Sequence, residues 1–580
     1  MSTEPAPEMS ERARRHAARR ARRRRRRRLR RLAFAAMVVT VVVGALAYAP
    51  ARRALRRARV QNLVTQAAQL LREQSPTDAV ERLKEALDLD PADRNALRAL
   101  AEVYTRRGLP AALPLWERLM RLPGAADRDA HDYLRAALDL GRFDLAETDL
   151  ARLLSQTNSP QETRVLATDF YLRQGDPTRA FEFAEEARKA DPTNELHQLR
   201  SARVLLAMPD PDRKREGLAR LGALSQPTPD LRLRVLELLR QAPDLPPAET
   251  LALLDRWKGT QDVPFAEDLA RTDLLVRLEP GRRAELISAV VRRHRLGSPE
   301  AQAALVTWLN RIGAQTELLA AYQREEALRQ PAVLPAYYEA LALSGRWTEL
   351  QAATAGTPAL EPAILDAFRT AVAVHLGQEE LAREHWRRAL DRAQDNPDRI
   401  QGLGELLVRL DCLPQALDAY DRLTRMPIYR ATGYRLLAEA YRQARDAERL
   451  RTLMTEWASF AGDDPGPENA FCYLSALLRK DFVRAERRAT ALVERFPPQI
   501  GYRATLAFVL LRRGEAAAAL DLFQRARADV SQASPETRLI YAATLDANDQ
   551  HERALAIVRQ LPRGDLLPEE LEIVRRIDPQ

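Results

Sequence analysis

The sequence predicts an all-α fold, a solenoid of stacked helical hairpins. Two observations support this prediction. Ala, Leu, Arg and Glu dominate the composition, whereas aromatic residues account for 6% and only 22 of 580 residues are glycine. Small residues also recur at a period close to 34 residues in both halves of the chain. A fixed period of this size is the sequence signature of a repeat architecture.

The N-terminus is strongly basic. Residues 12–31 contain 14 arginines, and we expect residues 1–31 to form a disordered, cytoplasmic tail. Residues 1–59 carry a net charge of +16, which leaves −6 for the rest of the chain. A nucleic-acid-binding solenoid should present a basic stripe, and this body has no excess positive charge from which to form one. We therefore expect no specific nucleic-acid partner.

An apolar stretch follows the tail. Residues 32–49 contain no charged side chain, and at ~1.5 Å per residue 18 residues span roughly 27 Å, close to the ~30 Å hydrocarbon thickness of a bilayer. We expect one transmembrane helix here. Arginines are more numerous before the stretch than after it, 14 against five. This bias predicts a single-pass inner-membrane protein with a cytoplasmic N-terminus and a periplasmic or extracytoplasmic body.

Other interpretations of the N-terminus remain open. A cleaved signal peptide could end at Ala49, after the sequence Ala47-Tyr48-Ala49, although Pro50 is a poor first residue of a mature chain. The arginine-rich tail could also bind an anionic polymer.

The repeat is defined by a small residue that opens the second helix of each predicted hairpin. These anchor residues are Ala79, Ala112, Ala146 and Ala180 in the first half, and Ala382, Ala416, Leu450, Ala485, Ala519 and Ala554 in the second. Apolar or small residues recur four and seven positions after each anchor, as with Leu83 and Ala86. This pattern predicts one buried stripe per helix, and we expect Trp116, Trp386 and Trp457 to lie in the core.

Glycines occupy the positions at which a first helix must end and the chain must reverse. A left-handed residue at this position suits glycine. The glycines are Gly108, Gly141, Gly175, Gly313, Gly345, Gly377 and Gly514.

These residues resemble the tetratricopeptide-repeat (TPR) family, in a membrane-anchored bacterial form. The best matches are Ala79, Leu83, Ala86 and Pro91 in one repeat, and Tyr171, Gly175, Ala180, Ala187 and Pro192 in another. The resemblance covers residues 60–206 and 298–580, which we expect to form two TPR lobes. It implies a right-handed superhelix whose concave groove binds peptides or protein surfaces.

Between the two lobes the register lapses. Residues 207–297 are rich in proline but keep helical apolar periodicity. We expect divergent helical hairpins here, not a separate domain or a flexible linker.

Motifs of catalysis are absent from the sequence. It has no phosphate-binding loop, no dinucleotide-binding glycine pattern, no nucleophile elbow and no zincin motif. Its seven histidines are scattered, and its two cysteines, Cys412 and Cys472, lie in different predicted repeats and should remain unpaired. We expect no enzyme activity, no cofactor and no metal site.

The resemblance also implies a partner-binding groove lined by the first helix of each repeat. By alignment with the family, positions five and nine of these helices include Arg98, Glu102, Arg135, Asp169, Gln401, Glu405, Arg435 and Glu439. Their mixed charges suit a protein–protein surface. We therefore predict a membrane-anchored scaffold that recruits envelope or secretion-related proteins. The alternative is a membrane-tethered adaptor that faces the cytoplasm. The sequence does not define the oligomeric state.

Overall fold

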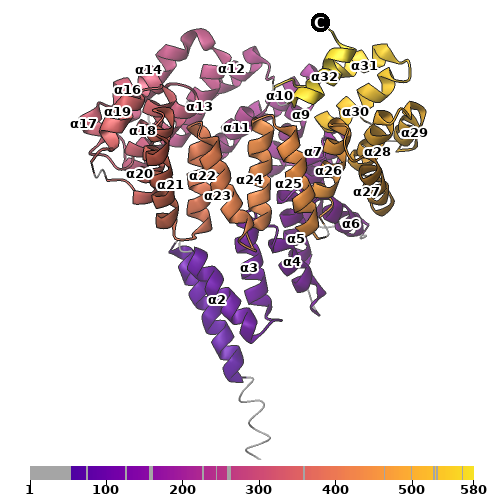
Figure 1. Cartoon of the computed structure of the whole chain (residues 1–580), viewed down its shortest axis with the longest axis horizontal. Coiled ribbons are helices and arrows are strands. Elements are labelled where there is room, and N and C mark those ends of the chain that lie inside the picture. Colours follow the sequence, from indigo (N-terminus) through magenta and orange to yellow (C-terminus); the bar gives the residue numbers. More distant parts are fainter. Residues whose placement is uncertain are drawn as a thin grey trace, which may run out of the picture. The chain divides into compact units, whose positions relative to one another are not determined.

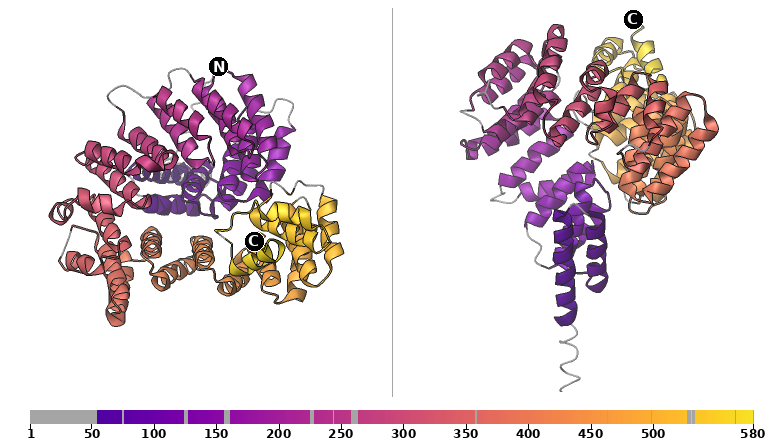
Figure 2. Two further views of the ribbon diagram at one scale, coloured as in Figure 1. Left: turned by 90° about the horizontal axis from the view of Figure 1, so that it is seen from above. Right: turned by 90° about the vertical axis from the view of Figure 1, so that its left-hand side faces the viewer.

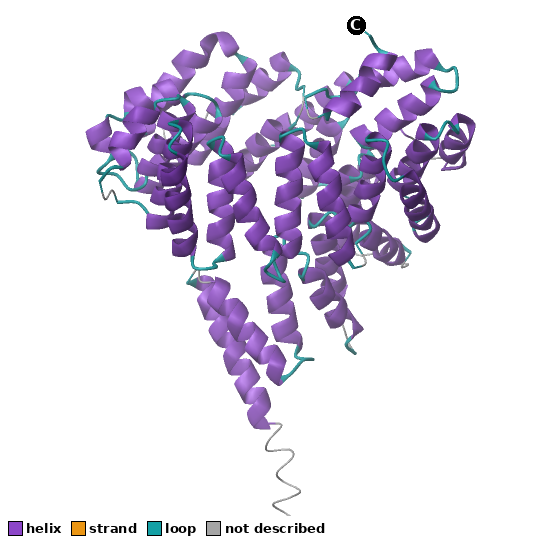
Figure 3. Ribbon diagram, viewed as in Figure 1, coloured by secondary structure: helices purple, strands orange, loops and turns teal. Residues whose placement is uncertain are grey.

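The computed structural model describes residues 54–579, apart from short gaps at 74–75, 124–126, 156–160, 225–227, 243, 258–262, 357–358, 463, 498, 527–529, 531–532 and 565. Every element in this part of the chain is a helix, and loops join the helices (Figures 1 and 3). Consecutive helices pair as hairpins, and the hairpins stack. The all-α fold of stacked helical hairpins predicted from the sequence is confirmed; the assignment to the TPR family and the right-handed sense of the superhelix stay predictions.

The first helices of the hairpins begin every 33–36 residues, with one interval of 28 between Leu334 and Pro362. After an N-terminal helix at 54–72, they are α3 (Arg94–Arg106), α5 (Asp127–Asp139), α7 (Gln161–Arg173), α9 (Glu195–Ala207), α11 (Pro229–Gln241), α13 (Phe265–Leu278), α15 (Pro299–Arg311), α18 (Leu334–Leu343), α20 (Pro362–His375), α22 (Pro397–Arg409), α24 (Arg430–Gln443), α26 (Gly466–Leu477), α28 (Ile500–Arg512), α30 (Pro535–Asp546) and α32 (Pro568–Ile577).

The second helices alternate with them. They are α2 (Pro76–Leu89), α4 (Ala112–Arg121), α6 (Phe143–Leu154), α8 (Pro177–Ala190), α10 (Pro211–Gly222), α12 (Pro247–Arg256), α14 (Arg283–His294), α16 (Gln315–Ala321), α17 (Arg324–Ala327), α19 (Trp347–Thr354), α21 (Glu379–Ala393), α23 (Leu413–Thr424), α25 (Ala447–Phe460), α27 (Phe482–Arg495), α29 (Ala516–Ala526) and α31 (His551–Val558), with the 3₁₀ turn η1 (Pro280–Arg282) before α14.

The chain divides into two compact units. The first ends at Asp129, and the second comprises Ala130–Gln580 together with the Gly108–Ala111 loop. In the second unit, neighbouring helices stack side by side in chain order (Figure 2). One continuous apolar cluster runs through this unit from Ile287 to Ile577.

The anchor residues form the contact between the two helices of each hairpin. All ten are buried, and none is more than 4% exposed. Ala180, for example, clusters with Ala184 of its own helix and Val204 of α9, and Tyr171 and Leu172 of α7 pack against this cluster. The predicted register is confirmed at these positions. Trp116 and Trp386 are buried as expected, whereas Trp457 is only partly buried and stacks on Tyr434.

The seven glycines at the predicted reversals all adopt the left-handed conformation, with φ between +64° and +92°. Four other hairpins reverse at the same position through Asp411, Arg445, Arg479 and Asp549, which also have positive φ. A glycine pattern in the sequence therefore finds only some of the reversals.

Helical hairpins continue through residues 207–297, where the sequence register lapses. At the position of the anchor, α10 has Lys214 and α12 has Thr250, and both are buried. The Lys214 ammonium donates a hydrogen bond to the Asp244 carbonyl (3.3 Å), and the Thr250 hydroxyl donates to the Pro246 carbonyl (2.7 Å). These polar side chains satisfy their hydrogen bonds locally, so the period persists without the alanines that reveal it in the sequence.

The least regular hairpins lie further on, within the region expected to be a regular lobe. The second helix after α15 is broken into α16 and α17, of seven and four residues, and α19 has only eight. Leu318 and Leu350 hold the anchor positions there and are fully buried.

Both cysteines are free, and both are buried. Burial raises the pKa of the Cys412 and Cys472 thiols to about 12.

The predicted membrane location is wrong. No helix in the described part of the chain is long and apolar enough to cross a bilayer. The longest helix in this part, at residues 54–72, has 19 residues, four of which are arginines, whereas a spanning helix needs about 20 apolar residues. We correct the single-pass, periplasm-facing location accordingly. The segments on which it was based, residues 1–31 and 32–49, lie outside the described residues.

A partly buried ion cluster joins three consecutive helices at the start of the divergent stretch. The Glu185 carboxylate of α8 accepts hydrogen bonds from Arg188 (2.8 Å), from Ser201 of α9 (2.6 Å) and from Arg220 of α10. Burial raises the pKa of Glu185, but these hydrogen bonds outweigh it and lower the pKa to about 2.

Ala180→Arg should strongly destabilise the protein, because no space for a guanidinium exists at the α7–α8 contact and an unpaired buried charge costs several kcal/mol, on the order of 3 or more. The control is Glu182→Arg, which introduces the same side chain at an exposed position of α8. Thermal melts of the purified variants should show a large loss for the first and little change for the second. Equal melting temperatures would contradict the register.

Lowering the pH should destabilise the protein in part through Glu185. The pKa of this carboxyl is lower in the folded state than its ordinary value of 4.5. Its contribution is therefore fully present above pH 4.5 and is lost as the pH falls toward 2. Glu185→Gln should remove this component, so the difference in melting temperature between wild type and variant should shrink from pH 5 to pH 2. A difference independent of pH would show that the cluster does not hold the carboxylate ionised.

Candidate functional site

Contacts between first helices identify the inner side of the curved second unit. Arg409 of α22 pairs with Glu339 of α18 (2.7 Å), passing over α20. Arg442 of α24 likewise lies 3.5 Å from Glu536 of α30, beyond α26 and α28. Side chains can reach past an intervening repeat only on the inside of a curve, where the repeats converge. The first helices therefore line the concave side, as the family resemblance implies.

A groove of about 390 Å³ lies on this side, across three consecutive first helices. We call it the inner groove. It is lined by Pro335 and Glu339 of α18, Ala363, Ile364 and Phe368 of α20, Asp398, Arg399, Gly402, Leu403, Leu406 and Arg409 of α22, and Glu361, which precedes α20.

The floor of the inner groove is apolar, and its openness depends on a glycine. Ile364, Phe368, Leu403 and Leu406 supply the apolar atoms. Gly402 is exposed in the middle of α22, and a Cβ atom added there would meet no atom within 4 Å. A side chain at this position would project into the open space above the floor.

Four of the five charged side chains that line the groove form two ion pairs with each other; the fifth is that of Asp398. Arg409 pairs with Glu339 at one edge, and Arg399 lies 3.3 Å from Glu361 at another. The groove therefore offers a ligand apolar surface framed by paired charges, an environment that suits an uncharged apolar side chain.

The predicted groove residues form local pairs near this site and elsewhere. On α22, Gln401 donates to Glu405 (2.8 Å), and on α24 Arg435 pairs with Glu439 (2.9 Å). Both pairs surround Tyr420, whose pKa is raised to about 12, chiefly by burial and then by the charges of Glu405 and Glu439. These residues flank the inner groove but do not line it.

The remaining predicted residues lie in other repeats. Arg135 pairs with Asp132 and Glu162 (both 3.1 Å), and Asp169 pairs with Arg203 (3.2 Å). In the first unit, Arg98 pairs with the buried Asp129 (2.7 Å), and Glu102 lies 3.6 Å from Arg106. Their role in binding stays a prediction. Sequence reasoning missed Gly402 and Leu406, although an exposed glycine inside a helical pattern is a signal of close approach or function.

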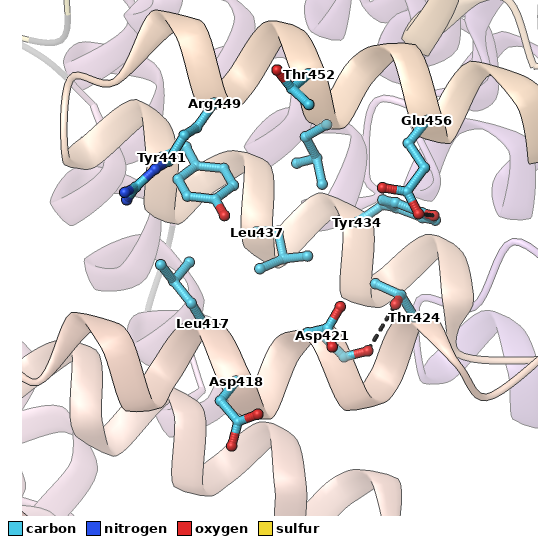
Figure 4. A pocket seen from close by; sticks show the side chains of 11 residues that line it. Leu417, Asp418, Asp421, Thr424, Tyr434, Leu437, Tyr441, Arg449, Thr452 and Glu456 are labelled. Atoms are coloured by element: carbon cyan, nitrogen blue, oxygen red, sulfur yellow. Dashed lines mark hydrogen bonds between the residues drawn. The ribbon is translucent and has the colours of Figure 1, made fainter.

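A second cavity, of about 450 Å³, lies between two neighbouring second helices. We call it the outer cavity. It is lined by Leu417, Asp418, Asp421 and Thr424 of α23, Tyr434, Leu437 and Tyr441 of α24, and Arg449, Thr452, Leu453 and Glu456 of α25 (Figure 4). The second helices α23 and α25 supply eight of its eleven lining residues, so it opens on the side of the second helices, away from the concave side.

Hydrogen bonds orient the polar groups of the outer cavity. The Tyr434 hydroxyl donates to the Glu456 carboxylate (2.9 Å), and the Trp386 indole N–H donates to Asp418 (2.7 Å). Burial raises the pKa of Tyr434, and the hydrogen bond to Glu456 raises it further.

The C-terminal helix α32 occupies the concave side of the last repeats. Its Glu570 is fully buried, accepts a hydrogen bond from the Tyr473 hydroxyl of α26 (2.6 Å) and caps its own helix at Leu567 N–H (2.7 Å). Burial raises the pKa of Glu570. Ile573 of α32 lies beside Phe508 of α28. The helix α32, which continues the series of first helices, thus contacts first helices as far back as α26.

Among the described residues, no group of three or more His, Cys, Asp or Glu side chains is arranged to hold a metal ion.

Comparison with known proteins provides no family assignment. No protein-family description matches the chain, and no curated protein matches it. Solved structures that resemble it include the Cut9–Hcn1 hetero-tetramer of APC/C, at 13% identity and a TM-score of 0.29, over 90% of this chain and 96% of that one. PilF of Pseudomonas aeruginosa is 18% identical, with a TM-score of 0.27, over 40% of this chain and 99% of that one. At these TM-scores neither likeness says which family the chain belongs to or what it does.

Proposed function

We propose that this chain is a protein-binding scaffold whose inner groove holds a segment of a partner protein. The observation that carries the proposal is an apolar floor shared by α20 and α22, bordered by α18 and left open by Gly402. Burying apolar surface is the main favourable term in protein association, and a groove lined by three first helices is long enough to contact a helical turn or several extended residues.

The contacts of α32 support this proposal. Within the chain, first helices already contact α32: its Glu570 bonds to Tyr473 of α26, and its Ile573 lies beside Phe508 of α28. An amphipathic helix with apolar residues at similar spacing is therefore the form of partner segment that we favour for the inner groove.

The polar residues predicted from the sequence complete the proposed surface. Gln401 and Glu405 lie on α22 beside the inner groove, and Arg435 and Glu439 lie on the next first helix, α24. Arg135 and Asp169 would extend contacts along the concave side of earlier repeats of the second unit, and Arg98 and Glu102 would offer a polar surface of their own in the first unit. Polar rims around an apolar centre are typical of specific protein interfaces.

This proposal concerns binding and not catalysis. It also does not include recruitment of envelope or secretion-related partners, or a membrane-tethered adaptor, because both depended on the membrane location. Binding of an anionic polymer by residues 12–31 stays a separate prediction on residues that the structure does not describe.

Gly402→Arg should block the inner groove without unfolding the protein. The new side chain would enter the space above Ile364 and Leu406, and glycine inside a helix is less favourable than arginine by about 1 kcal/mol, so stability should not fall. Peptides would be selected from a random library on the immobilised full-length chain. We expect their affinity for the variant to fall at least about tenfold, which corresponds to ~1.4 kcal/mol.

The matched control is Gly501→Arg. Gly501 also lies on a first helix, α28, with nothing within 4 Å of an added Cβ, but it does not line the inner groove. Undiminished binding of the selected peptides by Gly402→Arg, equal losses in both variants, or a library that yields no binding peptide would each refute the proposed site.

A further inference from the structure

The outer cavity has a chemistry different from that of the inner groove. Its floor is apolar, formed by Leu417, Leu437 and Leu453, but its polar lining is predominantly acidic. Three carboxylates line it, those of Asp418, Asp421 and Glu456, against the single guanidinium of Arg449. The cavity therefore combines apolar surface with excess negative charge.

The carboxylates of the outer cavity differ in whether a basic side chain pairs with them. Glu456 is bonded to the neutral Tyr434 hydroxyl, and no Arg or Lys of the described residues pairs with it. Asp421 forms an exposed pair with Arg425, one turn along α23. Arg449 pairs with Asp446 of its own helix (3.4 Å), and its guanidinium lies at the outer edge of the cavity in Figure 4. The guanidinium of Arg449 is thus paired with Asp446, which does not line the cavity.

The side chains converge on the open space. In Figure 4 the carboxylates of Asp421 and Glu456 face it from α23 and α25, on opposite sides, and the Tyr441 hydroxyl points into it from α24. A planar group with hydrogen-bond donors on two edges could bond to both walls while its stem lies on the leucines. Arginine has this shape, with five N–H donors in a rigid fork and an apolar stem, and its guanidinium stacks on aromatic rings such as those of Tyr434 and Tyr441.

Other ligands fit less well. An anion would face the excess of carboxylates. A metal ion would require converging oxygen ligands, and no such cluster is present in the described residues. A lysine ammonium is a compact, strongly hydrated point charge that cannot span two opposite walls.

We propose that the outer cavity binds an arginine side chain presented by a partner protein. This site goes beyond the proposed function, because it lies on second helices and is independent of the inner groove. With both sites occupied, one repeat region would hold two partners of different chemistry on its two sides.

The test uses the full-length chain and three fluorescent peptides of Gly and Ser that carry arginine, lysine or citrulline at the same three positions. Fluorescence anisotropy measures their affinity at low salt. We expect the arginine peptide to bind several-fold more tightly than the lysine peptide, and the citrulline peptide, which lacks the charge, not to bind. The double variant Asp421→Asn with Glu456→Gln should weaken binding of the arginine peptide at least tenfold.

Two controls make the result decisive. Glu379→Gln with Glu380→Gln removes two highly exposed carboxylates of α21 and should leave binding unchanged. Gly402→Arg should also leave it unchanged, so failure here and failure of the inner groove are distinguishable. If the double variant melts early, Glu456→Gln alone, which retains an acceptor for Tyr434, replaces it. Equal binding of the lysine peptide, equal loss in the α21 control, or no binding of the arginine peptide would overturn the proposal.

Discussion

The close approach of the two helices in each hairpin is the constraint on which the rest of this structure depends. A buried small residue at the start of the second helix, such as Ala180 or Ala416, permits it. Glycine serves the same purpose where a first helix meets a large neighbour: a Cβ on Gly404 would clash with the Tyr420 ring, and one on Gly433 would lie 2.6 Å from Thr424 N. Because each hairpin is held in this way, hairpins stack at a fixed spacing, and their first helices share one face of the array.

Much of this architecture could be predicted from the sequence, because its determinants are local. The anchors, the buried stripe and the glycine reversals repeat at a fixed period and need no knowledge of neighbouring repeats. The repeat could not be followed in the sequence where residues of another kind occupy the anchor positions. Lys214 and Thr250 are polar residues at anchor positions, and a sequence pattern of small residues cannot show that Asp244 and Pro246 satisfy their hydrogen bonds. The broken helix α16–α17 was missed because the buried Leu318 fits a regular stripe equally well.

The candidate sites were less predictable, because they depend on contacts between repeats. Alignment with the family placed Gln401 and Glu405 on the concave side, and they do lie on a first helix beside the inner groove. The groove itself exists because α18 and α22 approach each other closely enough for Glu339 to pair with Arg409, 70 residues apart. Curvature of this kind is a sum of small rotations between repeats, and no single residue encodes it. Trp457 also could not be placed from the sequence alone. It occupies a position of the predicted buried stripe, but it is only partly buried and stacks on Tyr434 near the outer cavity.

The inner groove and the outer cavity differ in how far their charged side chains are paired with opposite charges. At the inner groove, Arg409 and Arg399 are paired with Glu339 and Glu361. A charged ligand would have to break those pairs and gains little net electrostatic energy, so apolar contact dominates there. In the outer cavity, Glu456 has only a neutral partner, and a cation that enters meets an uncompensated carboxylate beside apolar surface. A surface charge pair is worth little where water screens it, but the leucine floor and the tyrosine rings exclude part of that water. The two proposed sites therefore follow from one scaffold, because stacking fixes the positions of the helices and exposed side chains remain free to differ between the inner and outer sides.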